Sequence, residues 1–309
     1  MKTKAYLFII ASAVFWGLIG LFVRTLSAQG FSPMQIVSIR AVVSALLMIL
    51  VLFKAGTQHL KINIKTMLPL VGMGIVSLTF SNFCYFTCIE LSSLAVAALL
   101  LYTAPIFVML MSLVLFGESF NFAKGVALGA TFLGCAFVTG AFDSDVSLSL
   151  AGLLFGLGSG IGYALYSIFG KYAIRNYSTL TITTYAFIFA SISSIPLAHF
   201  TSDLKYFEPA TLWSALGLAA LSTVIPYLLY TWGLEEVEAG RASILATVEP
   251  LVAAAVGIAV FSEPVTLHKL IGTVLICSSI IILNIPKEQL NNWHKKNNLL
   301  TYVNRLFCR

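Results

Sequence analysis

The sequence LLLYTAPIFVMLMSLVLFGE at residues 99–118 returns in altered form as ILATVEPLVAAAVGIAVFSE at residues 244–263. Each stretch is long and apolar enough to predict a helix, and each ends in a phenylalanine followed two positions later by a glutamate. Each also carries a proline near its first third, Pro105 or Pro250, and these prolines are 145 residues apart. We therefore predict that the two stretches are copies of one structural element.

The same offset of 145 residues aligns a longer region around both stretches. Over about 55 positions without a gap, identical residues recur at this offset. The identical pairs include Gly72 and Gly217, Ser77 and Ser222, Tyr85 and Tyr230, Glu90 and Glu235, Ala97 and Ala242, Pro105 and Pro250, Phe116 and Phe261, Glu118 and Glu263, and Lys124 and Lys269. The polar pairs weigh most, because an apolar composition raises the number of chance matches. The pattern indicates an internal duplication.

Composition places the chain in a membrane. Of its 309 residues, 59% are hydrophobic and only 10% are charged, and the mean hydropathy is +0.95. Soluble proteins carry about 25% charged residues. Ten predominantly apolar stretches are each long enough to cross a hydrocarbon core of about 30 Å as a helix. We predict an all-α membrane protein with ten transmembrane helices, at residues 5–26, 33–53, 67–89, 93–116, 121–140, 150–171, 180–200, 211–232, 241–261 and 267–285.

The basic residues indicate how these helices are oriented. With the N-terminus in the cytoplasm, 14 of the 18 Lys and Arg residues fall on the inner side, and only Arg24, Lys205 and Lys269 fall on the outer side. This asymmetry predicts that both termini are cytoplasmic. The net charge of +6 is therefore explained by sidedness, and we expect no nucleic-acid partner.

Five helices per copy is an odd number, so the second copy is predicted to enter the membrane upside down. Inverted repeats around a site near the membrane midplane are a recurrent architecture of transporters. The predicted organisation is a first five-helix repeat at residues 1–141, a second at 150–286, and a cytoplasmic tail at 287–309. The segment 142–149 is the predicted seam between the repeats.

Several short motifs carry a resemblance to a known family. They are Phe15-Trp16-Gly17, Arg40 within the second predicted helix, Phe116-Gly117-Glu118, Glu249-Pro250 and Phe261-Ser262-Glu263. With them the chain resembles the drug/metabolite transporter superfamily, specifically its EamA-type ten-helix transporters, over residues 5–285. The resemblance implies a secondary carrier without a bound prosthetic group. It is specific for the family and weak for the substrate, since such carriers export amino acids and other metabolites or import other small solutes.

Two charged residues stand out within predicted helices. Arg40 is costly at membrane depth, so it is expected to face a cavity or an ionic partner, with snorkelling to the interface as the alternative. Glu249 precedes Pro250, which cannot donate a backbone hydrogen bond and frees carbonyls in the turn before it. A carboxylate at such a kink is suited to bind a cationic group or carry a proton. The alternative is a carboxylate that only packs helices together.

Further candidates for a substrate cavity are aromatic and polar residues within the predicted helices. Such rings stack on aromatic groups or hold amines, although Tyr and Trp also gather at membrane interfaces for structural reasons. These candidates are Trp16, Asn82, Tyr85, Tyr102, Tyr163, Tyr166 and Tyr227. A structural role is predicted for the repeated residues Pro105, Glu118, Pro250 and Glu263, with the two glutamates as caps or loop locks.

Catalytic and metal-binding motifs are missing from the sequence: it holds no HExxH, no Walker A loop and no GxSxG. We therefore predict no enzyme, no metal site and no cofactor. The predicted function is secondary active transport of a small polar metabolite by alternating access across the cell membrane, with export of amino acids or related compounds favoured. Expected partners are the substrate, a coupling proton or ion, and the lipid bilayer. A homodimer is an alternative to a monomer. The alternative is a non-transporting membrane protein, either a scaffold or an intramembrane enzyme.

Overall fold

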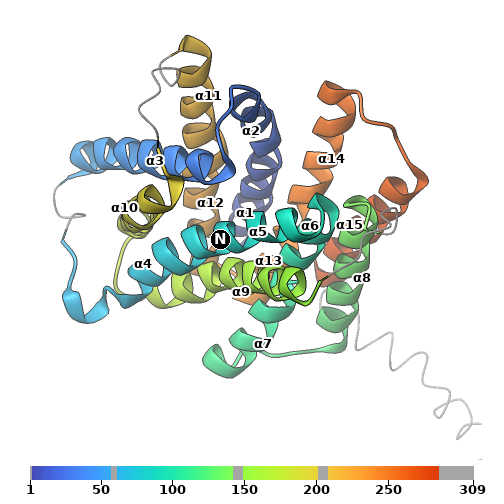
Figure 1. Ribbon diagram of the computed structural model, residues 1–309. Coiled ribbons are helices and arrows are strands. Elements are labelled where there is room, and N and C mark those ends of the chain that lie inside the picture. The colour runs from blue at the N-terminus through green and yellow to red at the C-terminus, as the bar shows by residue number, and fades with distance from the viewer. Residues whose placement is uncertain (1, 57–60, 142–148, 201–207, 285–309) are drawn as a thin grey trace, which may run out of the picture.

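The computed structural model describes residues 2–56, 61–141, 149–200 and 208–284, and within these ranges every regular element is helical (Figure 1). The elements are α1 (Lys2–Gly17), α2 (Ile19–Ala28), α3 (Pro33–Ala55), η2 (Ile64–Thr66), α4 (Leu68–Gly72), η3 (Met73–Phe80), α5 (Ser81–Leu91), α6 (Leu94–Leu101), α7 (Ala104–Phe116), α8 (Phe122–Val138), α9 (Leu150–Ala173), α10 (Thr179–Ala198), α11 (Pro209–Ala219), η5 (Ala220–Val224), α12 (Ile225–Glu236), α13 (Ala239–Leu245), α14 (Val248–Phe261) and α15 (Leu267–Asn284). The predicted tail at 287–309 and nearly all of the predicted seam lie outside the described residues.

Eight helical stretches in the described part of the chain are long and apolar enough to cross a membrane. They overlap eight of the ten predicted helices and run over Thr3–Ala28, Pro33–Ala55, Leu68–Leu91, Leu94–Phe116, Leu150–Ala173, Thr179–Ala198, Pro209–Glu236 and Ala239–Phe261. The other two predicted positions hold the shorter apolar helices Phe122–Val138 and Leu267–Leu283. The chain is therefore a multi-pass membrane protein.

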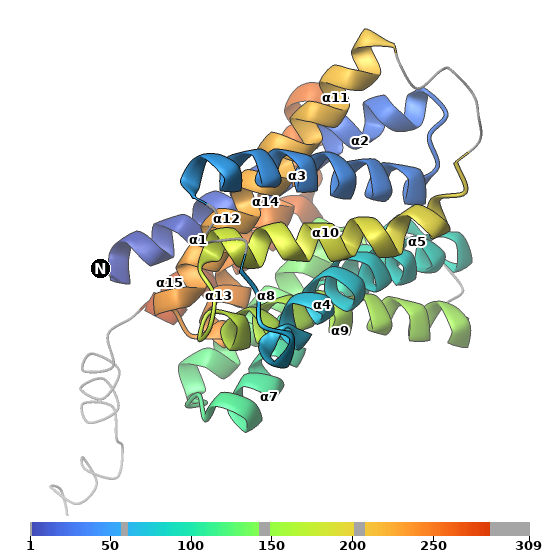
Figure 2. The same cartoon turned by 90° about the vertical axis from the view of Figure 1, so that its left-hand side faces the viewer.

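Helix packing follows the internal duplication. The most extensive contacts join α8 to α15, α3 to α10, α1 to α12 and α5 to α9. Figure 2 shows α3 and α10 running side by side along one face of the molecule. Each of these pairs joins an element of the first half to one of the second. When the halves are exchanged at the 145-residue offset, the α8–α15 and α3–α10 pairs each map onto themselves, and the α1–α12 pair maps onto the α5–α9 pair. The packing therefore has an approximate internal symmetry.

Both repeated stretches are interrupted helices rather than the single helices that the sequence predicted. The first breaks between α6 and α7 at Tyr102 and Thr103, just before Pro105. The second breaks between α13 and α14 at Ala246 and Thr247, just before Pro250. A proline lacks the backbone N–H and its ring clashes with the carbonyl four residues earlier, which accounts for the place of both breaks.

The third helix of each half contains a π-helical segment, η3 around Ser77 and η5 around Ser222. These serines are one of the identical pairs at the 145-residue offset, so the irregularity occurs at matching positions in both halves. Single-turn π segments within α-helices are frequent at functional sites, because they unpair part of the backbone ladder. A further break falls between α1 and α2, where Gly17 meets α14. A Cβ at Gly17 would lie 2.5 Å from Val252 Cβ and 2.9 Å from the Glu249 carbonyl oxygen.

Candidate functional site

A cavity of about 430 Å³, which we call the main cavity, lies between the halves of the molecule. Its polar lining comes from α1, α2, α3, η3, α5, α9, α12 and α14, and includes the break between α6 and α7. Eight of the nine residues predicted to form a substrate cavity line it: Trp16, Arg40, Asn82, Tyr85, Tyr102, Tyr163, Tyr227 and Glu249. At one end the cavity reaches the surface beside Arg24, Leu94 and Glu263.

Glu249 is one of two anionic groups that line this cavity, the other being Glu263 where the cavity reaches the surface. The break before Pro250 determines where Glu249 lies. The break makes Val248 the first residue of α14, so Glu249 falls in the first helical turn. Backbone N–H groups and the helix dipole favour a negative charge there. The hydroxyl of Tyr163 on α9 donates a hydrogen bond to Glu249 Oε2 at 3.1 Å. The carboxylate is therefore held in one orientation across the interface between α9 and α14.

Arg40 is one of two cationic groups that line the cavity, the other being Arg24 where the cavity reaches the surface. It lies on α3 between the buried residues Ser38 and Ala41 and is itself half-buried. Arg40 lines the main cavity together with Glu249, and it also lines a small void of about 10 Å³. The site thus combines a guanidinium and a carboxylate with a set of neutral hydrogen-bonding rings.

Tyr166 is the one predicted residue that does not line the main cavity. It lines a smaller void of about 30 Å³ next to it, which also contacts Ser243 on α13 and Val108 on α7. Its hydroxyl lies 3.2 Å from Thr231 Oγ1, so its polar group has a partner within the fold. Its ring packs edge-on against Tyr227 with 4.8 Å between centroids. Tyr166 therefore supports the wall of the cavity.

Two buried polar groups on the cavity wall lack hydrogen-bond partners among the described residues. Trp16 Nε1 and Ser77 Oγ are both buried, and neither has a hydrogen-bond partner among the residues that the structure describes. Both residues line the main cavity and the smaller void. A buried polar group without a partner costs about 1–3 kcal/mol, so a ligand or water is expected to satisfy these two. Ser77 was not predicted as a site residue, although its identity with Ser222 was the available signal.

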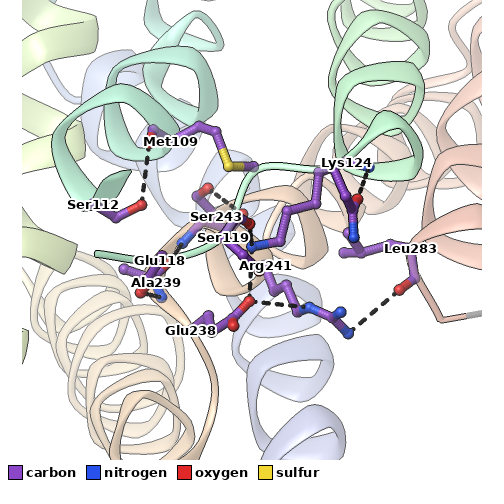
Figure 3. A network of polar contacts seen from close by, with 12 residues as sticks. Met109, Ser112, Glu118, Ser119, Lys124, Glu238, Ala239, Arg241, Ser243 and Leu283 are labelled. Atoms are coloured by element: carbon purple, nitrogen blue, oxygen red, sulfur yellow. Dashed lines mark hydrogen bonds and ion pairs between the residues drawn. The ribbon is translucent and has the colours of Figure 1, made fainter. Parts of the chain in front are cut away.

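The opposite end of the molecule, which we call the Glu118 end, is closed by a polar network (Figure 3). Glu118 follows α7, and its two carboxylate oxygens accept hydrogen bonds from the backbone N–H groups of Ala239 and Gly240, at 2.7 and 3.1 Å. These are the first two residues of α13. Beside them, Lys124 Nζ lies 2.8 Å from Glu238 Oε2, with only 1% of the Lys124 side chain exposed.

Further contacts extend the network at the Glu118 end. Arg241 Nε lies 3.2 Å from the same Glu238 oxygen, and its guanidinium also donates to the Tyr6 hydroxyl on α1 and the Leu283 carbonyl on α15. Met109 on α7 packs so closely on Gly240 that an added Cβ would lie 2.9 Å from its sulfur. Figure 3 shows Met109, Glu238, Arg241 and Leu283 converging from segments far apart in the sequence. Glu118, predicted to be a cap, thus caps a distant helix.

At the other end, which we call the Glu263 end, the matching glutamate has different partners. Arg24 Nη2 lies 2.5 Å from Glu263 Oε1, and Lys269 Nζ lies 3.2 Å from Oε2. Arg24 also lies over the ring of Phe261, 3.8 Å from its centroid. About half of the Arg24 side chain and a third of the Glu263 side chain are exposed. The hydrogen bond from Arg24 holds the pKa of the Glu263 carboxyl below its ordinary value despite partial burial.

The backbone leading to the two glutamates is the same at both ends. Each helix ends at a residue in the left-handed conformation, Gly117 with φ 63° and Ser262 with φ 55°. The N–H of each following glutamate then donates to the carbonyl six residues earlier, at 3.3 and 3.1 Å. Both helices thus end with a left-handed residue and a backbone hydrogen bond that closes the last turns. The backbone therefore positions the two carboxylates in the same way, although the carboxylates bind different partners.

Comparison with known proteins agrees with this architecture. The chain matches the model of the EamA-like transporter family over residues 3–140 and again over 150–285. An uncharacterized transporter of Archaeoglobus fulgidus is 32% identical over 214 residues, covering 69% of this chain and 75% of that protein. The uncharacterized transporter YwfM of Bacillus subtilis is 24% identical over 292 residues, covering 94% of this chain and 97% of that protein.

A solved crystal structure has the same fold. It matches with a TM-score of 0.81 at 16% sequence identity, covering 94% of this chain and 99% of its own. The two family matches together span nearly the whole chain, and they coincide with the halves related by the 145-residue offset. The chain belongs to the EamA-like transporter family.

Proposed function

We propose that the protein is a secondary active transporter that moves a small zwitterionic metabolite, an amino acid or a close relative, by alternating access. The observation that carries this proposal is the main cavity, which combines Arg40, Glu249 and unpartnered polar groups and reaches the surface at one end. A site between two similar halves that opens to one side and is closed on the other is what alternating access requires.

The proposed membrane arrangement has ten spans in two inverted five-helix repeats. The two shorter apolar helices, α8 and α15, supply the ninth and tenth spans and pack against each other. The excess of basic residues on one side supports a cytoplasmic N-terminus and a cytoplasmic C-terminus. In this arrangement the Glu118 end faces the cytoplasm, and the cavity opens to the outside.

The chemistry of the cavity supports a zwitterionic substrate. Arg40 offers paired donors that suit a carboxylate, and Glu249 offers acceptors that suit an ammonium group. Trp16 Nε1 offers one more donor, and Ser77 Oγ offers a donor or an acceptor. A substrate that brings both charges neutralises both groups, whereas a substrate with a single charge leaves one of them uncompensated in a partly dry site.

We further propose that transport is export coupled to protons through Glu249. One carboxylate binds either the substrate ammonium or a proton, so the two compete for it. Competition at one site is the basis of exchange, and an inward proton gradient then drives the substrate out. The position of Glu249 beside the helix break, with Tyr163 as its partner, supports this role.

The first test is the thermal stability of the purified chain with amino acids, matching amines and matching carboxylic acids. A ligand at a hundred times its Kd stabilises the folded state by about 2.7 kcal/mol. We expect the amino acid to stabilise more than either analogue. Arg40→Ala should remove the preference for the amino acid over its amine, a change of about tenfold or more in relative affinity. Lys54→Ala, at the exposed end of the same helix, is the control.

The second test is flux in liposomes that contain the purified chain. We expect an imposed proton gradient to drive the solute against its concentration, and Glu249→Gln to abolish this coupling. Glu236→Gln, at an exposed position on α12, is the matched control. If Arg40→Ala and Glu249→Gln both left transport intact at normal protein levels, the assigned site would be wrong. If the wild-type chain moved no solute in any direction, the result would favour the non-transporting alternative.

A further inference from the structure

The contacts of Glu118 define a site that has a counterpart elsewhere in the chain. Glu118 binds the backbone N–H groups of the first two residues of α13, Ala239 and Gly240. Subtracting the 145-residue offset gives Leu94 and Ala95, which are the first two residues of α6. The offset that maps Glu118 onto Glu263 therefore maps its binding partner onto the N-terminus of α6.

The N-terminus of α6 is available in this structure. The side chain of Ser93 accepts a hydrogen bond from Val96 N–H at 3.2 Å, which satisfies the third residue of the helix. The N–H groups of Leu94 and Ala95 have no hydrogen-bond acceptor among the described residues. Leu94 is 63% exposed and lines the main cavity together with Glu263. Glu263 and the first residue of α6 thus line the same cavity.

Glu263 is held only loosely where it lies. Its partners Arg24 and Lys269 form ion pairs near the surface, and such pairs contribute little to stability. A carboxylate on the first N–H groups of a helix gains two charge-assisted hydrogen bonds and the interaction with the helix dipole. Lys269 also donates to the Pro264 carbonyl, as Lys124 donates to the matching Ser119 carbonyl. Lys269 can therefore keep its bond to the Pro264 carbonyl when the Glu263 carboxylate moves to another partner.

We propose that Glu118 and Glu263 are gate residues that engage in turn. In the state described here Glu118 binds α13 and closes the Glu118 end. In the opposite state Glu263 binds the N–H groups of Leu94 and Ala95, α6 moves onto α14 to close the Glu263 end, and Glu118 releases α13. This inference rests on the proposed function, because only alternating access requires both states.

The test measures how fast a small polar thiol reagent labels one cysteine at each end, in the full-length chain with its five native cysteines replaced. Val256→Cys reports the Glu263 end, because Val256 lines the main cavity. Ser243→Cys reports the Glu118 end, because Ser243 is buried on α13 beside the smaller void. In the otherwise unchanged chain we expect fast labelling at 256 and slow labelling at 243.

The gate variants should move these rates in opposite directions. Glu118→Ala removes two hydrogen bonds to a charged group, so the ratio of labelling at 243 to labelling at 256 should rise roughly tenfold to a hundredfold. Glu263→Ala removes the bonds of the opposite state, so the ratio should stay low or fall. The double variant should return toward the wild-type ratio. Glu236→Ala and Glu90→Ala, two exposed glutamates close to α13 and α6, are the controls and should change nothing.

Two results would overturn the gate roles. One is an unchanged ratio in Glu118→Ala and also in Glu118→Gln, which keeps the side-chain size if the alanine variant folds poorly. The other is a raised ratio in Glu263→Ala. Labelling needs no substrate, so the two proposals fail separately. Responsive labelling without any solute flux would overturn the transport proposal alone, and solute flux with unresponsive labelling would overturn the gates alone.

Discussion

The Glu118 end and the Glu263 end are built from matching residues and yet make different contacts. Each has a glutamate after a left-handed residue and a lysine six positions later that donates to the carbonyl following that glutamate. At the Glu118 end the lysine is buried and the carboxylate caps a helix of the other half. At the Glu263 end the lysine is partly exposed and the carboxylate pairs with side chains near the surface. The same sequence pattern therefore supports a closed and an open arrangement.

The largest difference between the ends is expected on removal of the lysines. Lys124 is fully buried and bonded to both Glu238 and the Ser119 carbonyl, so Lys124→Ala leaves a cavity and unpaired groups. We expect a loss of about 2–3 kcal/mol in the free energy of unfolding. Lys269→Ala, with a fifth of its side chain exposed, should cost less than about 1 kcal/mol. Denaturant unfolding in detergent measures both, and equal losses would contradict the asymmetry.

A second prediction separates charge from packing at the buried lysine. Lys124→Met keeps most of the apolar stem and removes the ammonium group. Because the stem itself fills space in a tightly packed region, we expect Lys124→Met to lose about half as much stability as Lys124→Ala. The same unfolding measurement applies. If the two variants lost the same amount, the ion pair with Glu238 would carry the whole effect.

A smaller effect is expected at the residues that end the two helices. Gly117 and Ser262 are both left-handed, a conformation that costs a side-chain residue about 1–2 kcal/mol. A Cβ at Gly117 would meet no atom within 4 Å, so Gly117→Ala should lose about 1 kcal/mol through the backbone alone. Ser262→Gly should gain somewhat less, since glycine also loosens the unfolded chain. Thermal unfolding of the two variants should shift in opposite directions, and shifts of the same sign would contradict this argument.

Particular residues show how much the sequence could predict. The apolar stretches lie where helices were expected, because length and hydropathy determine what can cross a bilayer. Eight of nine polar or aromatic candidates line one cavity, since polar groups within such helices avoid lipid and face an interior space. The helix breaks before Pro105 and Pro250 were less visible, although a kink at Pro250 was expected from its missing N–H.

The differences between the halves could not be predicted. The identity of Glu118 and Glu263 at one offset implies equal environments, whereas the two glutamates have different partners in the structure. No local pattern indicates that Glu118 reaches a helix more than 120 residues away, because that contact depends on how the halves pack. The absence of hydrogen-bond partners for Trp16 Nε1 and Ser77 Oγ among the described residues could not be predicted either, because it depends on how the side chains of the cavity wall pack.

The smallest expected effect concerns pH at the Glu263 end. Arg24 lowers the pKa of the folded Glu263 carboxyl below its ordinary value, so the pair stabilises the fold above that ordinary value and the contribution is lost as the pH falls through the lowered pKa. For an ion pair this exposed we expect less than about 1 kcal/mol. Thermal unfolding of the wild type and of Glu263→Gln between pH 7 and the acid range measures the difference. The two curves should converge in acid and separate toward neutral pH, and a gap that widened in acid would show that Arg24 does not hold the carboxylate in its charged form.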